Sequence, residues 1–357
     1  MSKDPASLVR DEIRALKAYH VAPAAGLVKL DAMENPYPLP ESLAREMAEG
    51  LARVAINRYP DPTAPGLKQA LREAMAVPGH LDILLGNGSD EILQIISLAL
   101  ARPDAVALAP EPSFVMYRMS AIAAGLRYVG VPLKPDFTLD EDALIAAIGK
   151  HRPALVWIAY PNNPTGNLFP RDAILRIVEA TPGLVVVDEA YYAFSGGATL
   201  MDEVGRHPNL LLVRTVSKLG LAGLRLGCAI GTRAWLEEFE KLRLPYNVNV
   251  LSAMAGELLL AHRDVLDEQT RRIVSDRASL EKALDAIPGI ERFPSAANFV
   301  LVRVPDGPRT FEALRQSGIL VRTFHGSHAL LANCLRLTVG TPDENRRLVD
   351  VLRTILS

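Results

Sequence analysis

Short apolar runs alternate with longer stretches of helical periodicity from about residue 80 onward. Residues 184–187, for example, read "LVVV", so this run is apolar at every position. Such a run is typical of a strand in a parallel sheet that is covered on both faces. Strand, turn and helix recur in a regular order. This pattern predicts a doubly wound α/β domain with a mostly parallel central sheet.

The pattern changes near residue 245. Beyond it, long helical stretches surround the short apolar runs "NFVLVRV", "GILVRTF" and "CLRLTVG", which predict a smaller α+β domain. The final helix should begin at "TPDE", where Thr341 suits the N-cap, Pro342 the first helical position and Glu344 the third. We therefore expect an N-terminal arm with part of the small domain (1–35), a large domain (36–245) and a small C-terminal domain (246–357).

Composition excludes several classes of protein. Of the 357 residues, 49% are hydrophobic and 22% charged, which suits a sizeable core. The net charge of -2, without a long run of one sign, gives no reason to expect nucleic acid or an anionic membrane as partner. Two cysteines argue against a disulfide framework or a thiolate metal site, and no apolar stretch reaches the roughly 18 to 20 residues of a membrane span. We expect a soluble, cytoplasmic protein without a signal peptide.

Five of the apolar runs end in polar or aromatic groups. In open α/β sheets, ligands bind outside the carboxyl ends of the strands. Because the carboxyl ends of parallel strands meet at one edge, we expect these groups to surround a single pocket. They are residues 86–90, Phe114, residues 163–166, Asp188 with Tyr191, and Ser217 with Lys218.

The first of these segments, "GNGSDE", lies between an expected strand and an expected helix. Free backbone N–H groups and the helix dipole favour an anion such as phosphate there. The segment departs from the dinucleotide-binding fingerprint because Glu91 stands where that pattern has its third glycine. A tight turn in which Ser89 is the N-cap is the alternative.

Asp188 and Lys218 follow apolar runs and should lie at the edge of the low-dielectric interior. A carboxylate at such a place needs a cationic partner, and a structural ion pair is one way to provide it. Desolvation should lower the pKa of Lys218 from its usual value of about 10.4, and a lysine of this kind forms Schiff bases. A lone lysine is more often a surface residue whose stem covers apolar atoms.

Six motifs stand in order along the chain: "RYPD", "GNGSDEIL", "PNNPTG", "VVDEAY", "SKLGLAGLRLG" and "LRLTVGT". Together they make the chain resemble the fold-type-I, class-II aminotransferases that depend on pyridoxal 5'-phosphate, over nearly its whole length. Within this family, the chain is most similar to the branch that acts on L-histidinol phosphate. The resemblance implies a transamination with 2-oxoglutarate that yields imidazole-acetol phosphate and L-glutamate, in histidine biosynthesis.

The resemblance also implies roles for the residues at the strand ends. Lys218 would bond to the cofactor aldehyde and then act as the base that moves the substrate's α-proton. Asp188 would pair with the pyridine nitrogen and keep it protonated. Asn163 and Tyr191 would hydrogen-bond to the 3-oxygen of the ring, and Phe114 would stack on its face.

The cofactor phosphate would be held by a second set of groups. Ser89 and Asp90 would offer backbone N–H groups, and Ser217 and Arg225 would complete the cradle, since a guanidinium matches phosphate oxygens with two parallel bonds. The stretch from Lys218 to Arg225 is one residue shorter than in many relatives. Tyr59 of "RYPD" would reach the phosphate of a neighbouring subunit, which implies a homodimer.

Two arginines in the C-terminal part are candidates for substrate binding. Alternation in "CLRLTVG" places Arg336 opposite an apolar face, so it is also compatible with a solvated face. Arg322 shares its face with apolar neighbours in "GILVRTF", and an arginine there usually has an anionic partner. The resemblance implies that both grip the substrate phosphate, with Tyr19 and Asn35 lining the site.

Other interpretations stay open at this point. An aromatic or broad-specificity amino-acid aminotransferase and a threonine-phosphate decarboxylase share the expected fold. A non-catalytic regulator would need a DNA-binding extension, for which the roughly 30 residues before "LDAMENPY" leave no room. His325 and His328 lack a supporting carboxylate or cysteine cluster, so we assign them to a loop and expect no metal site.

Overall fold

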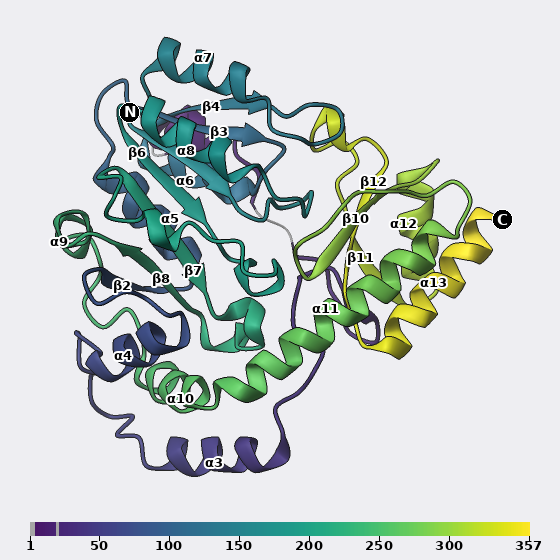
Figure 1. Cartoon of the computed structure of the whole chain (residues 1–357), viewed down its shortest axis with the longest axis horizontal. Helices are drawn as coiled ribbons and strands as arrows, with labels where there is room; N and C mark the ends of the chain where they lie inside the picture. The colour runs from purple at the N-terminus through teal and green to yellow at the C-terminus, as the bar shows by residue number, and fades with distance from the viewer. Residues whose placement is uncertain (1–3, 19–20) are drawn as a thin grey trace.

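The computed structural model describes residues 4–18 and 21–357. Figure 1 shows two bodies, one built on a seven-stranded sheet and the other on a five-stranded sheet. The long helix α11 (Arg263–Asp285) runs from the first body to the second (Figure 1). Within the described residues, no helix is both long and apolar enough to cross a membrane.

The larger sheet is mostly parallel, which confirms the prediction from sequence. Its strand order is β2-β8-β7-β6-β5-β3-β4, and β8 runs antiparallel to both of its neighbours. The strands are β2 (Asp82–Asn87), β3 (Val106–Glu111), β4 (Arg127–Pro132), β5 (Leu155–Ala159), β6 (Leu184–Asp188), β7 (Leu210–Thr215) and β8 (Leu226–Gly231). The five strands expected to end at the pocket, β2, β3, β5, β6 and β7, all run in the same direction.

Helices cover both faces of this sheet. On one face, α5 (Ser89–Ala99), α6 (Val115–Ala124) and α9 (Arg233–Glu240) enclose one apolar cluster. On the other, α4 (Pro65–Ala74), α7 (Glu141–His151), α8 (Arg171–Ala180) and α10 (Val250–Ala261) enclose a second. Val156 of β5 points into the second cluster and Trp157 into the first. Because both faces are covered, the central strands are apolar at successive positions.

The smaller sheet has the order β1-β11-β12-β10-β9. Strand β1 (Val28–Leu30) pairs in parallel with β11 (Ile319–Thr323), so a strand from the N-terminal region completes a sheet formed by the C-terminal part. The other strands are β9 (Glu291–Arg292), β10 (Phe299–Arg303) and β12 (Cys334–Thr338), packed with α11, α12 (Gly307–Gln316) and α13 (Pro342–Leu356). The capping box at the start of α13 is present, as predicted.

The remaining helices lie at the edges of the two bodies. Helix α3 (Glu41–Ala52) packs on α10. The short helices α1 (Pro5–Leu8) and α2 (Asp11–Arg14) lie near α6, where Arg10 donates a hydrogen bond of 2.6 Å to the carbonyl of Ala123. The division of the chain into domains at residues 35 and 245 stays a prediction.

Candidate active site

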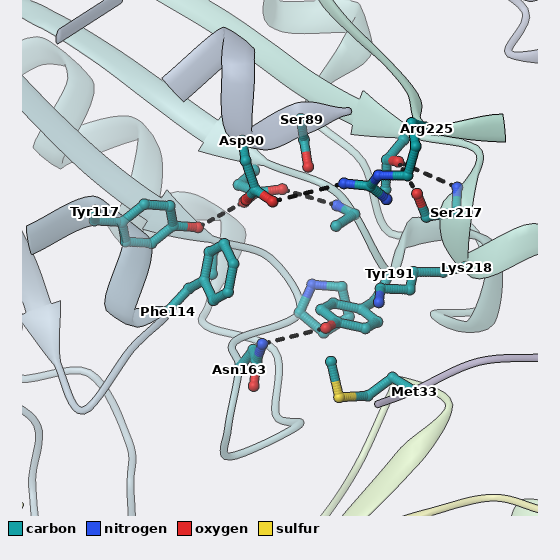
Figure 2. A pocket seen from close by; sticks show the side chains of 15 residues that line it. Met33, Ser89, Asp90, Phe114, Tyr117, Asn163, Tyr191, Ser217, Lys218 and Arg225 are labelled. Atoms are coloured by element: carbon teal, nitrogen blue, oxygen red, sulfur yellow. Dashed lines mark hydrogen bonds and ion pairs between the residues drawn. The ribbon is translucent and has the colours of Figure 1, made fainter. Parts of the chain in front are cut away.

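A pocket of about 560 Å³ opens where the carboxyl ends of β3, β5, β6 and β7 meet the start of α5. Figure 2 shows Phe114 and Tyr117 on one side of the pocket and Lys218 and Arg225 on the other. Nine of the residues predicted from sequence line it: Ser89, Asp90, Phe114, Asn163, Asp188, Tyr191, Ser217, Lys218 and Arg225.

The start of α5 forms a place for an anion. Gly88 occupies the N-cap position with φ of 85°, so Ser89 is the first helical residue and not the cap. The backbone N–H groups of Ser89 and Asp90 therefore have no acceptor within the helix. A Cβ at Gly88 would lie 2.8 Å from Nη2 of Arg225, so only glycine lets the guanidinium approach this closely. A Cβ at Gly227 would clash with the backbone nitrogen of Ser89.

Arg225 adds positive charge to this place. Its Nη2 lies 3.9 Å from Oδ2 of Asp90, and its side chain is half exposed toward the pocket opening. Ser217 lies on the same side in Figure 2, and its backbone N–H donates to Thr215 Oγ1 at 3.1 Å. A phosphate group bound here could accept hydrogen bonds from a guanidinium, a hydroxyl and backbone N–H groups.

Lys218 lies in the 3-10 turn η3 (Ser217–Leu219), directly after β7. Its Nζ donates a hydrogen bond of 3.3 Å to the carbonyl of Ala32 and lies 5.9 Å from the ring centroid of Tyr191. Burial, together with the nearby positive charge of Arg336, lowers the pKa of Lys218 to about 8. More of this amine is neutral near pH 7 than in an ordinary lysine, and the neutral form is the nucleophile.

Asp188 ends β6 and is buried. Its Oδ2 accepts a hydrogen bond of 2.8 Å from the hydroxyl of Tyr117, and its Oδ1 accepts one of 3.1 Å from the N–H of Ala190. Burial raises the pKa of Asp188 to about 6. Among the described side chains, no lysine or arginine forms an ion pair with it, so the expected cationic partner has to come from a molecule in the pocket.

Arg336 is buried, so the alternative of a solvated face is wrong. Only 4% of it is exposed, because residues from the seven-stranded body cover that face of β12. Its Nη1 donates to Asn163 Oδ1 at 2.6 Å and its Nη2 to the carbonyl of Asp31 at 2.8 Å. Asn163 Nδ2 donates in turn to the Tyr191 hydroxyl at 3.2 Å. Arg336 does not line the pocket itself but orients two groups that do.

Arg322 lies directly opposite Arg336 in the antiparallel register of β11 and β12. Directly opposed residues project from the same face of a sheet, so the two guanidinium groups share one face. The pair concentrates positive charge at this face of the sheet, which suits an anionic ligand.

Among the described residues, four predicted ones do not line the pocket: Arg322, Arg336, Asn35 and Tyr59. Asn35 Nδ2 donates to Gln269 Oε1 at 2.8 Å and to the carbonyl of Leu219 at 3.3 Å, beside the turn that carries Lys218. Tyr59 is 82% exposed and stacks on Tyr246, with ring centroids 4.6 Å apart. Tyr19 lies outside the described residues.

The two histidines considered for a metal have other contacts. His325 Nδ1 lies 3.1 Å from Asn333 Oδ1, and His328 accepts a hydrogen bond from the N–H of Leu330 as the cap of a 3-10 turn. In the part of the chain that the structure describes, no group of three histidine, cysteine, aspartate or glutamate residues is arranged to hold a metal ion.

Sequence reasoning missed Tyr117, Met33 and Thr215, which also line the pocket. Tyr117 follows Phe114 by three positions, a spacing that brings two residues of a helix to the same face, and this signal could have revealed it. Met33 adopts φ of 53°, and its N–H donates to Thr338 Oγ1 at 3.1 Å. Nothing in the sequence around Met33 signals that conformation.

Comparison with known proteins agrees with this geometry. The family model described as "Aminotransferase class I and II" matches residues 25–352. Histidinol-phosphate aminotransferase of Chromobacterium violaceum is 56% identical over 346 residues, which cover 97% of each chain. Histidinol-phosphate aminotransferase 1 of Burkholderia lata is 52% identical and covers 99% of each chain.

A solved structure is similar along the same length. The histidinol-phosphate aminotransferase from Sinorhizobium meliloti, in complex with pyridoxal-5'-phosphate, superposes with a TM-score of 0.88 at 26% identity and covers 98% of each chain. Because the family model spans most of the sequence and relatives more than half identical match its whole length, the chain belongs to the class I and II aminotransferase family and, within it, to the histidinol-phosphate aminotransferases.

Proposed function

We propose that the protein binds pyridoxal 5'-phosphate in this pocket and transfers the amino group of L-histidinol phosphate to 2-oxoglutarate. The products are imidazole-acetol phosphate and L-glutamate, and the step belongs to histidine biosynthesis. The observation that carries the proposal is the joint placement of Lys218, whose pKa is lowered, and Asp188, a buried carboxylate without a cationic partner among the described residues. Relatives at 52–56% identity carry this activity in their names.

The side chains of the pocket suit the cofactor part by part. Asp188 would hold the protonated ring nitrogen, which supplies the missing cation. Asn163 and Tyr191, joined by their own hydrogen bond, would hold the 3-oxygen. Phe114, at the N-cap of α6, would cover one face of the ring. When bound, the cofactor supplies an electron-accepting ring that stabilises the charge left as the substrate loses its α-proton.

The start of α5 suits the cofactor phosphate. Ser89 and Asp90 would donate backbone N–H groups, and Ser217 and Arg225 would donate from their side chains. Phosphate at this end also explains the glycine at position 88, because a side chain there would displace the guanidinium of Arg225.

We assign the proton transfer at the substrate's α-carbon to Lys218. A base works best when its pKa lies near the working pH, and burial brings the pKa of Lys218 down to about 8. Nζ donates to the carbonyl of Ala32, the neighbour of Met33, and both Met33 and Lys218 line the pocket.

The substrate phosphate would be held by Arg322 and Arg336. These two guanidinium groups share one face of the five-stranded sheet, and Arg336 reaches the pocket through Asn163. The same pair suits a carboxylate of 2-oxoglutarate, since a guanidinium binds either anion with two parallel bonds. Asn35 lies beside the Lys218 turn, and Tyr19 stays a prediction for this site.

We further propose a cytoplasmic homodimer in which Tyr59 reaches the cofactor phosphate of the partner subunit. The support is an exposed apolar surface formed by two neighbouring segments. Arg243 Nη2 joins them by donating to the carbonyl of Pro62 at 2.8 Å. Large exposed apolar patches of this kind mark contact surfaces. The side chains concerned are Ile56, Tyr59, Leu242, Leu244 and Tyr246.

A panel of amino donors tests the proposed reaction. Purified protein with bound cofactor would be given 2-oxoglutarate and, in separate assays, L-histidinol phosphate, phenylalanine, aspartate or threonine phosphate, with glutamate formation as the readout. We expect turnover of histidinol phosphate to exceed the others by at least about a hundredfold in kcat/KM. Preference for phenylalanine would instead assign a broad-specificity aminotransferase, and carbon dioxide released from threonine phosphate would assign a decarboxylase.

A further inference from the structure

Tyr117 lines the pocket, but the proposed function assigns it no role. It lies in the first turn of α6, and its hydroxyl donates a hydrogen bond of 2.8 Å to Oδ2 of Asp188. Figure 2 shows the ring of Tyr117 beside that of Phe114, with its hydroxyl directed toward the middle of the pocket.

The position of this hydroxyl is fixed by aromatic packing. The ring of Tyr117 is fully buried and stacks on Trp157 of β5, with centroids 5.3 Å apart and planes 4° from parallel. It also meets Phe114 edge to face, with centroids 5.6 Å apart. A ring held on two sides by other rings cannot turn its hydroxyl away from Asp188 without disturbing both contacts.

The hydroxyl can only act as the donor in this bond. Burial and the adjacent negative charge of Asp188 raise the pKa of Tyr117 well above its ordinary value, so the phenol keeps its proton. Ala190 donates to the other carboxylate oxygen through its backbone N–H. Each oxygen of Asp188 therefore has one protein donor, and its remaining acceptor capacity is available to a group in the pocket.

The other charges around Asp188 oppose its ionisation. Asp90 on α5 and Glu189, the next residue along the chain, are both negative, while Lys218 faces the pocket from η3. Burial and these two carboxylates raise the pKa of Asp188, and the hydrogen bonds from Tyr117 and Ala190 act in the other direction. Removal of the Tyr117 hydroxyl would leave the backbone N–H as the one donor among the described groups.

We propose that Tyr117 is a positioning residue, which keeps Asp188 ionised and directed at the ring nitrogen of the cofactor. This inference rests on the proposed function, because it assumes that a pyridine ring occupies the pocket. Phe114 and Tyr117 then form one unit on α6, in which the first side chain covers the ring face and the second prepares the carboxylate that meets the ring edge.

Binding of pyridoxamine phosphate to the full-length protein freed of cofactor tests the proposal without any turnover. This compound has no aldehyde and cannot bond covalently to Lys218, so its affinity measures non-covalent binding alone. Tyr117→Phe keeps the ring and removes the hydroxyl. We expect its dissociation constant, measured by equilibrium dialysis at pH 7, to rise by about tenfold, as for the loss of one hydrogen bond to a charged group.

Tyr192→Phe is the matched control. Tyr192 is partly buried, and its hydroxyl oxygen is buried without a hydrogen-bond partner among the described residues. This variant should bind pyridoxamine phosphate within about twofold of wild type. A second control uses the analogue of pyridoxamine phosphate in which carbon replaces the ring nitrogen. Because that analogue makes no bond to Asp188, Tyr117→Phe and wild type should bind it equally.

The pH dependence distinguishes positioning from packing. Binding requires ionised Asp188, so the affinity of wild type should fall as the pH drops through about 6. Loss of the donor disfavours the ionised carboxylate, so the midpoint of this fall should move to higher pH in Tyr117→Phe, by about one unit. A residue that only packs would weaken binding equally at every pH.

A measurement on the wild-type chain covers the case in which Tyr117→Phe does not fold. With ¹³C at Cζ of its nine tyrosines, one resonance should titrate with a midpoint near pH 6 in the cofactor-free protein and stop doing so in Asp188→Asn. An unchanged midpoint in Tyr117→Phe, equal loss with the carbon analogue, or no such resonance would overturn the proposal. Failure of wild type itself to bind pyridoxamine phosphate would instead overturn the proposed function.

Discussion

Arg336 of β12 and Asn163, four residues beyond the end of β5, are joined by a hydrogen bond of 2.6 Å between Nη1 and Oδ1. The bond connects the five-stranded sheet to the pocket formed at the edge of the seven-stranded sheet. Because Asn163 donates in turn to Tyr191, a single guanidinium orients both groups that we assign to the cofactor's 3-oxygen. The substrate-binding side and the cofactor-binding side therefore share one hydrogen-bonded chain.

Arg336→Lys should separate geometry from charge. An ammonium keeps the charge but cannot hold the carbonyl of Asp31 and the Asn163 amide with the fixed fork of a guanidinium. We expect KM for histidinol phosphate to rise by about tenfold or more. Arg346→Lys, at an exposed arginine of α13 paired with Asp343, serves as control and should leave KM unchanged. If both variants keep the KM of wild type, the guanidinium geometry of Arg336 does not contribute to substrate binding.

Arg322→Ala should weaken binding of a phosphorylated substrate selectively. The arginine shares a sheet face with Arg336, and its removal leaves one guanidinium where two would share the anion. We expect KM to rise by about tenfold or more for L-histidinol phosphate, and by less than about twofold for L-histidinol, which has no phosphate. Steady-state kinetics on both amines measure the difference, and equal losses would argue against phosphate recognition at this position.

Asp188→Asn should stabilise the cofactor-free protein at neutral pH while it abolishes cofactor binding. The folded-state pKa of Asp188, about 6, lies above its ordinary value of 3.8, so ionisation costs the folded state free energy. Each pKa unit corresponds to about 1.4 kcal/mol, which makes the cost about 3 kcal/mol once the group is fully ionised.

The sign of this effect sets the pH window. Below about pH 4, Asp188 is protonated in both the folded and the unfolded chain, and wild type and Asp188→Asn should unfold alike. As the pH rises from about 4 to 6, wild type should lose stability relative to the variant, and the difference should stay constant above that range. Urea unfolding of both cofactor-free proteins at pH 4 and pH 7 measures it. A difference of the same size at both pH values would contradict the assignment to Asp188.

Hybrid dimers should reveal whether Tyr59 acts across subunits. Lys218→Ala removes the proposed base, and Tyr59→Phe removes a hydroxyl that is 82% exposed in its own chain. Each variant alone should lose activity, the first completely and the second by about tenfold through weaker cofactor binding. A hybrid contains one site with Lys218 from one chain and Tyr59 from the other.

We therefore expect a mixture of the two variants, unfolded and refolded together, to regain activity above the sum of the separate proteins. Wild type carried through the same refolding provides the reference. If the mixture shows only the sum, Tyr59 does not complete the partner's site.

The strand ends show what the sequence could predict. Asp188 follows a run that is apolar at every position, and Lys218 follows the apolar run 210–213 after a few residues. Parallel strands bring such ends together whatever the details of the turns. Eight of the nine predicted pocket residues follow from that rule, and Arg225 was expected from the family resemblance. Strands β4 and β8 were not predicted from the sequence. Strand β8 begins directly after Arg225, within a motif that the resemblance assigns to phosphate binding.

Other features depend on the meeting of distant segments. Burial of Arg336 follows from contacts with Asn163 and Asp31, which lie 173 and 305 positions away along the chain. Alternation within β12 predicts which face of the sheet Arg336 projects from, but not which residues cover that face. The partner of Asp188 was not predictable for the same reason. The sequence suggested a cation, but the carboxylate accepts a hydrogen bond from Tyr117, which lies 71 positions away on another element.

The parallel pairing of β1 with β11 has a consequence for biosynthesis on the ribosome. Residues 28–30 leave the exit tunnel long before residues 319–323 are made, so the first strand must stay unpaired until β11 has emerged. The carbonyl of Ala32, two residues beyond that strand, is the acceptor for Lys218. The segment that holds the Lys218 amine thus takes its place in the sheet only after β11 has been made.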